Sequence, residues 1–170
     1  MIRLIFVFLF ISASMPAFSY EKLWGSGNDV FMFSFLVNQN GDNLDLLSEG
    51  RYNNNVEFKI HDYVHKCETD AEISLIDSSV EYKNINKLST LLFAYKIGCV
   101  GGIEPYNIKY FAFQDGKKYA LRGEEMIMTP EGVFGGENGP SPSVNLKRKK
   151  ELMDYMLSKW RIFSLRKYKE

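Results

Sequence analysis

Alternation of hydrophobic and polar residues recurs through most of the chain and predicts a series of β-strands. From Val56 to His61 apolar and polar side chains strictly alternate, which is typical of a strand with one face in water. Further strands are expected where aromatic and β-branched residues concentrate, at 30–37, 73–80, 88–97, 108–113 and 119–121. Turn residues at 38–43 and the pair Asp115-Gly116, which suits a type I′ turn, predict hairpins between strands.

Near the C-terminus the apolar spacing changes to three and four residues and predicts one amphipathic helix. Its apolar stripe comprises Leu152, Met153, Met156, Leu157, Trp160 and Phe163. The preceding segment 129–143 is rich in Gly and Pro, so we expect a surface loop there. Ser141 is expected to cap the helix with Pro142 at its first position, and 165–170 to fray. The fold class is therefore α+β, mainly antiparallel β-sheet with one C-terminal amphipathic helix.

The first nineteen residues have the pattern of a secretory signal peptide. Arg3 gives a positive start, 4–11 is an uncharged apolar run, and Ala17-Phe18-Ser19 suits cleavage before Tyr20. The run is shorter than the roughly 20 apolar residues of a transmembrane helix, so no transmembrane segment is expected. We predict a signal peptide at 1–19, a single β-rich globular domain at 20–170 and a periplasmic location. The alternative is a short buried helix in a cytosolic protein.

The chain has two cysteines, Cys67 and Cys99. An oxidising compartment would join them in a disulfide, and closing that loop would stabilise the fold by about 3–4 kcal/mol in the chain-entropy picture. The alternatives are a catalytic thiol or half of a metal site. Neither cysteine lies in a CxxC motif, and neither has an obvious catalytic partner.

Charge and motifs favour binding over catalysis. The 21 basic and 21 acidic residues balance, which gives no field to attract nucleic acid. His61 and His65 are four residues apart, a spacing that suits a metal ion on a helix but not on a strand, so no metal site is expected. No Gly-x-Ser-x-Gly motif is present, and Glu124 and Glu125 would point to opposite faces of a strand. We therefore predict a protein that is not an enzyme.

The segment after Cys99 is a candidate recognition loop. Gly101-Gly102 allows tight backbone geometry, and Pro105 restricts Glu104 to extended conformations. Tyr106 would offer a large contact area at low entropic cost. A plain connection between two strands is an equally good interpretation.

The stretch from Leu92 to Gly123 resembles a family of exported bacterial proteins of the immunity and lysozyme-inhibitor type. In that family an aromatic strand ends in a cysteine, a loop closes on proline, and a Lys-Tyr-Ala-Leu/Ile-Arg-Gly strand follows. The matching residues here are Phe93, Tyr95, Cys99, Pro105 and the run 118–123. The Gly135-Gly136 loop and a last helix ending near Trp160 also fit. Some relatives are labelled surface polysaccharide biosynthesis proteins.

The resemblance implies an inhibitory partner and not a reaction. A xanthomonad periplasmic immunity protein in the family blocks a lysozyme-like peptidoglycan hydrolase that a secretion system delivers. By analogy, Glu104, Tyr106 and Glu137 are the expected partner-binding residues. An acidic or hydroxyl-bearing side chain would occupy the space that sugar takes between the catalytic carboxylates of the hydrolase.

Relatives also carry an Asp-x-Asp-x-Asp-Gly calcium loop before the strand that leads to the cysteine. At the matching positions Asn84 and Asn86 replace carboxylates, so no cofactor is expected, and the two amides should form turn hydrogen bonds.

The alternative function is an envelope carbohydrate-binding module without catalysis, in which Tyr52, Tyr63 and Tyr106 stack on sugar rings.

Overall fold

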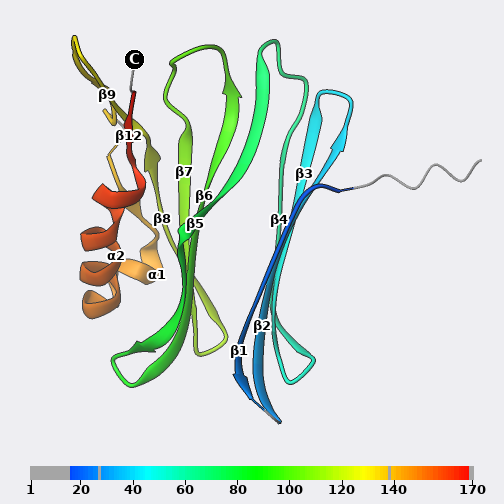
Figure 1. The fold of residues 1–170 in the computed structure, drawn as a ribbon. Helices are drawn as coiled ribbons and strands as arrows, with labels where there is room; N and C mark the ends of the chain where they lie inside the picture. The colour runs from blue at the N-terminus through cyan, green and yellow to red at the C-terminus, as the bar shows by residue number, and fades with distance from the viewer. Residues whose placement is uncertain (1–15, 27, 138, 169–170) are drawn as a thin grey trace, which may run out of the picture.

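The computed structural model describes residues 16–26, 28–137 and 139–168, which form three β-sheets and two helices. The first sheet is an antiparallel meander in chain order (Figure 1). Its strands are β1 (Pro16–Ser26), β2 (Asp29–Asn40), β3 (Asn43–Tyr52) and β4 (Asn55–Val64).

The second sheet has the order β11-β8-β7-β6-β5, and all its pairs are antiparallel. Its strands are β5 (Asp70–Ile85), β6 (Leu88–Val100), β7 (Asn107–Gln114), β8 (Lys117–Glu124) and β11 (Ser141–Pro142). A small third sheet of order β10-β9-β12 consists of β9 (Met126–Thr129), β10 (Gly132–Gly135) and β12 (Leu165–Lys167). The helices are α1 (Val144–Lys147) and α2 (Lys150–Phe163).

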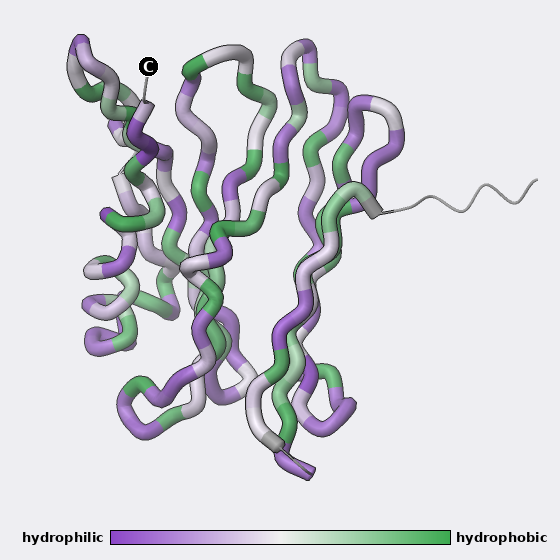
Figure 2. The backbone as a smooth tube through the Cα atoms, viewed as in Figure 1, coloured by the Kyte–Doolittle hydropathy of each residue, from purple (hydrophilic) through white to green (hydrophobic). Residues whose placement is uncertain are grey.

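The second sheet is the middle layer, with the first sheet on one face and the helices on the other (Figure 1). Phe33 and Phe35 of the first sheet pack on Phe93 and Tyr95 of β6, and all four are fully buried. The opposite core is built by β7, β8 and the apolar stripe of α2. Because β6 has a core on each face, residues 90–95 are all buried, whereas 31–38 of β2 alternate between buried and half-buried positions. Hydrophobic and hydrophilic residues intermix along the strands of both sheets (Figure 2).

The predicted fold class is confirmed, as is the disulfide between Cys67 and Cys99, whose Cα atoms lie 5.4 Å apart. Asp115 and Gly116 have φ values of 53° and 63°, which confirms the expected turn between β7 and β8. In the part of the chain that the structure describes, no helix is long and apolar enough to cross a membrane.

Several expectations about the C-terminal part were wrong. The segment 129–143 is not all loop, because β10 pairs with β9 and β11 pairs with β8. Ser141 therefore lies in a strand, and Ser143 occupies the N-cap position of α1. The helix is broken at Lys149, whose φ and ψ of −117° and 73° are not helical. Residues 165–167 do not fray, since β12 pairs in parallel with β9.

Residues 1–15 of the predicted signal peptide lie outside the described residues. Residues 16–19, its predicted end, extend β1 along β2, and the ring of Phe18 lies 6.2 Å from that of Phe35. A mature chain that begins at Tyr20 keeps the pairing of β1 with β2 from Tyr20↔Phe35 onward.

Candidate functional site

The loop between β6 and β7 and the end of β10 lie together, at one end of the second sheet. The position where Gly135 would carry a Cβ is 2.9 Å from Cβ of Pro105, so only glycine fits this close approach. We call residues 101–105 and 135–137 the loop edge. Two of the predicted partner-binding residues, Glu104 and Glu137, are exposed on it, as is Ile103, with 45% of its surface accessible.

Tyr106 does not form the exposed tip of this loop as expected. It is only 9% exposed, and the cations of Lys96 and Arg166 lie 5.8 and 5.4 Å from its ring centroid. Burial, together with the nearby Glu72 carboxylate, raises the pKa of Tyr106 to about 12. The tyrosine is thus part of the base of the loop edge and stays neutral at physiological pH.

A buried carboxylate joins this base to three elements. The side chain of Glu125 has no exposed surface, and its two oxygens lie 2.5 Å from Nζ of Lys96 and 3.1 Å from Nε of Arg166. The backbone N–H of Glu125 donates to the carbonyl of Tyr106 at 2.8 Å. The Arg166 guanidinium also donates to the carbonyl of Glu104 at 2.9 Å. The cluster therefore holds the backbone of the loop in place, and the role of Glu125 is structural.

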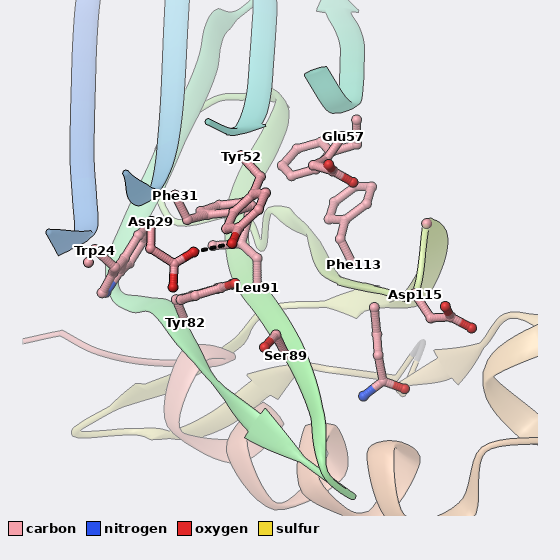
Figure 3. Close-up of a pocket in the computed structure, with 14 residues that line it drawn as sticks. Trp24, Asp29, Phe31, Tyr52, Glu57, Tyr82, Ser89, Leu91, Phe113 and Asp115 are labelled. Carbon is pink, nitrogen blue, oxygen red and sulfur yellow. Dashed lines mark hydrogen bonds between the residues drawn. The ribbon is translucent and has the colours of Figure 1, made fainter. Parts of the chain in front are cut away.

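An open pocket of about 740 Å³ lies at the opposite end of the sandwich, where the hairpin turns of the two sheets meet. Figure 3 shows Trp24, Asp29, Phe31, Tyr52 and Tyr82 on one side of it and Glu57, Phe113 and Asp115 on the other. We call it the aromatic pocket.

Stacked rings form the walls of the aromatic pocket. Phe31 and Tyr82 stack with centroids 4.5 Å apart, and the indole of Trp24 lies 5.6 Å from Tyr82. Phe58 and Phe113 stack 3.6 Å apart on the other side. These pairs join a ring of the first sheet to a ring of the second, so they hold the two sheets together at their open end.

Gly50 makes room for one of these rings. A Cβ at this position would lie 2.1 Å from Cε1 of Phe58, the residue that pairs with Gly50 across β3 and β4. The register shifts between Gly50 and Arg51, so a β-bulge accompanies the close approach. The glycine thus allows Phe58 to lie flat against β3.

Of the three tyrosines proposed to stack on sugars, Tyr52 lines the aromatic pocket and is 38% exposed. Its hydroxyl donates to the Asp29 carboxylate, which raises the pKa of Tyr52. Tyr63 lies on β4 and stacks on His65 at 4.7 Å, away from this pocket, and Tyr106 is buried. The structure therefore does not bring the three rings together.

A second hollow of about 420 Å³ adjoins the disulfide and contains a partly buried acid, Asp62. Its carboxylate accepts hydrogen bonds from the Tyr95 hydroxyl, at 2.7 Å, and from the Lys109 ammonium. Burial alone would raise the pKa of Asp62, but these bonds outweigh burial and lower it. The group ties β4 to β6 and β7.

The two histidines considered as metal ligands instead contact a neighbouring carboxylate. His61 and His65 each place Nε2 3.4 Å from a different oxygen of Asp45. Among the described residues no group of three His, Cys, Asp or Glu side chains is arranged to hold a metal ion. Asn84 lies in β5 and accepts a hydrogen bond from Ser89, its cross-strand partner on β6, and Asn86 occupies the left-handed region of the β5–β6 turn with φ of 51°.

Sequence reasoning missed most of the aromatic pocket. Trp24, Asp29, Glu57 and Asp115 flank three different hairpin turns, and no motif links them along the chain. The available signal was an aromatic or acidic residue beside each turn, since alternate turns of an antiparallel meander lie at the same end.

Comparison of the chain with protein-family models, with curated proteins and with solved structures finds no match.

Proposed function

We propose that this chain is a periplasmic, non-enzymatic protein of the inhibitor or immunity type, which binds a peptidoglycan hydrolase and occludes its cleft. The observation that carries the proposal is the loop edge, which exposes Ile103, Glu104 and Glu137 on a base fixed by buried ion pairs. The resemblance of 92–123 to exported immunity proteins supplies the class of partner. The Cys67–Cys99 disulfide suits an oxidising compartment such as the periplasm.

Occlusion follows from a rigid and exposed loop. A loop that is already ordered loses little conformational entropy on binding, so more of the contact energy appears as affinity. Glu104 and Glu137 would place carboxylates where the hydrolase normally holds sugar. Because Tyr106 is buried, Ile103 takes the role of apolar anchor that the tyrosine was expected to fill.

The test is inhibition of purified cell-wall hydrolases by the chain from residue 20 to 170. The panel should include lysozymes and the muramidases and amidases encoded beside the gene. We expect one of them to form a complex and lose activity, and we expect I103D and E104K to weaken inhibition by at least about 30-fold, the effect of a hot-spot residue. L23D is the matched control, because Leu23 is 65% exposed on β1, outside the loop edge. Absence of any complex, or full inhibition by I103D and E104K, would contradict the proposal.

A second candidate function, carbohydrate binding without catalysis, is favoured by Tyr52 and its neighbours in the aromatic pocket. Aromatic rings beside hydrogen-bonding carboxylates are suited to sugar rings, which have apolar faces and hydroxyl rims. Binding to isolated peptidoglycan or polysaccharide with no hydrolase present, weakened in Y52A and unchanged in I103D, would support this function over the first.

A further inference from the structure

The aromatic pocket is strongly asymmetric in charge. Three carboxylates line it, those of Asp29, Glu57 and Asp115, and all three residues are exposed. The described residues that line it include no lysine, arginine or histidine. A cleft lined by charges of one sign raises the local concentration of ligands of the opposite sign and disfavours anions.

Several donors of the pocket are already engaged in hydrogen bonds within the protein. The side-chain NH2 group of Gln114 already donates hydrogen bonds to the carbonyl of Ile85, at 3.1 Å, and to Oγ1 of Thr90, at 2.7 Å. Ser89 donates to Asn84, and Tyr52 donates to Asp29. Besides the indole N–H of Trp24 and the hydroxyl of Tyr82, the polar side chains left for a ligand are the three carboxylates, so a ligand that brings charged donors fits best.

The walls suit a cation as well as an apolar body. The faces of tryptophan and tyrosine rings attract ammonium groups within about 6 Å of the centroid. Lys22, which does not line the pocket, already places its ammonium 5.2 Å from the Trp24 ring and donates to the carbonyl of Val80. At about 740 Å³ the pocket is much larger than a single ammonium group needs, and it falls in the usual range for small-molecule sites.

We infer that the aromatic pocket binds an organic cation, a ligand with one or more protonated amines on an apolar or ring-shaped body. Its amines would be held by Glu57 and Asp115, and its body would lie against the Phe31–Tyr82 and Phe58–Phe113 stacks. Two sources share this chemistry: polyamines and amine-bearing sugars. The inference does not depend on binding of a hydrolase, because the pocket and the loop edge lie at opposite ends of β7.

The experiment compares three probes by isothermal titration calorimetry: spermidine, a trimer of glucosamine, and the neutral trimer of N-acetylglucosamine. We expect at least one amine-bearing probe to bind at least about tenfold more tightly than the neutral trimer at low salt, and to weaken as salt screens the carboxylates. The stronger of the two amines identifies the source. Trp24 is one of only two tryptophans, so in W160F a saturable change in fluorescence places the ligand at the pocket.

The E57Q and D115N variants test the assigned carboxylates, and E131Q is the control, because Glu131 is exposed and lies outside the pocket. Both pocket variants should bind the amine at least about tenfold more weakly than E131Q, the magnitude expected of a lost charge-assisted hydrogen bond. Equal affinity for the neutral trimer, binding unchanged in E57Q and D115N, or no binding of any probe would each overturn the inference. Calorimetry on the unaltered chain gives the answer even where W160F is destabilised.

Discussion

Replacing Glu125 with glutamine tests whether the buried ion cluster holds the loop edge in place. The substitution keeps the shape of the side chain but removes the charge that Lys96 and Arg166 share at 2.5 and 3.1 Å. The Glu125 side chain has no exposed surface, whereas Lys96 and Arg166 keep 21% and 23% of theirs. Both cations would then face a neutral amide on their buried side.

The expected loss of stability follows from this burial. Removing one partner of a fully buried ion pair costs about 3–5 kcal/mol, because the remaining charge stays without compensation. Since both cations here reach solvent, screening reduces the loss, and we expect about 2–3 kcal/mol in the free energy of unfolding. That is a shift of roughly 30- to 150-fold in the unfolding equilibrium.

The assay is guanidinium denaturation of the oxidised protein, followed by circular dichroism, with hydrogen exchange of 101–106 as a local readout. E124Q is the matched control, because Glu124 is the neighbouring residue, only half-buried, and forms no ion pair among the described residues. Faster exchange in 101–106 should accompany the loss in E125Q. The reasoning is refuted if E125Q lowers the free energy of unfolding by no more than about 0.5 kcal/mol beyond the effect of E124Q.

Three further outcomes are expected. G50A would place its Cβ 2.1 Å from the Phe58 ring, so it should lower the unfolding free energy by about 1–3 kcal/mol, and an unchanged melting temperature would contradict this packing. The pKa of Asp62 is lowered on folding, so its contribution to stability is present above its ordinary value of 3.8 and is lost as pH falls through the lowered pKa. D62N should therefore flatten the acid limb of the stability curve, and an unchanged limb would count against the assignment. Expression in a bacterium with an intact export pathway should give a mature chain beginning at Tyr20, and an intact mass that retains 1–19 would contradict the predicted cleavage.

The parts of the fold that the sequence predicted are those set by local chemistry. Period-two alternation depends on which neighbours reach the core, so the strand at Val56–His61 was recognisable without knowledge of its partners. The turn at Asp115-Gly116 depends on the backbone preferences of two adjacent residues. The disulfide prediction required only two cysteines with no other evident role and the expectation of an oxidising compartment.

The parts that failed depend on pairing between distant segments. Leu165 continues beyond a helix and carries no strand pattern of its own, yet it pairs with Met126, and both segments meet only in the folded chain. The proline after Ser141 predicts a helix cap at this serine, but the free edge of β8 offers strand pairing at Arg122. In both cases tertiary contacts outweighed a local signal.

The same distinction explains the errors at the candidate sites. Tyr106 follows a Gly-rich loop, which is a sound local reason to expect exposure. However, Lys96 of β6, Glu125 between β8 and β9, and Arg166 of β12 converge on it. The aromatic pocket is likewise a product of topology, because its residues flank turns that only the stacking of two sheets brings together. Glu104 needed no such information, since a loop tip is exposed whatever lies below it.

The position of β7 explains how this fold can offer two unlike surfaces. The strand begins at Asn107, beside the loop edge, and ends at Gln114, which lines the aromatic pocket. Between these ends its residues alternate between the two cores, with Phe111 facing the first sheet and Tyr110 facing α2. Packed cores transmit strain but do not deform freely, so a rigid strand of this kind holds both ends at a fixed separation. A protein partner at the loop edge and a cationic ligand in the pocket would then contact the same molecule without competing for any side chain.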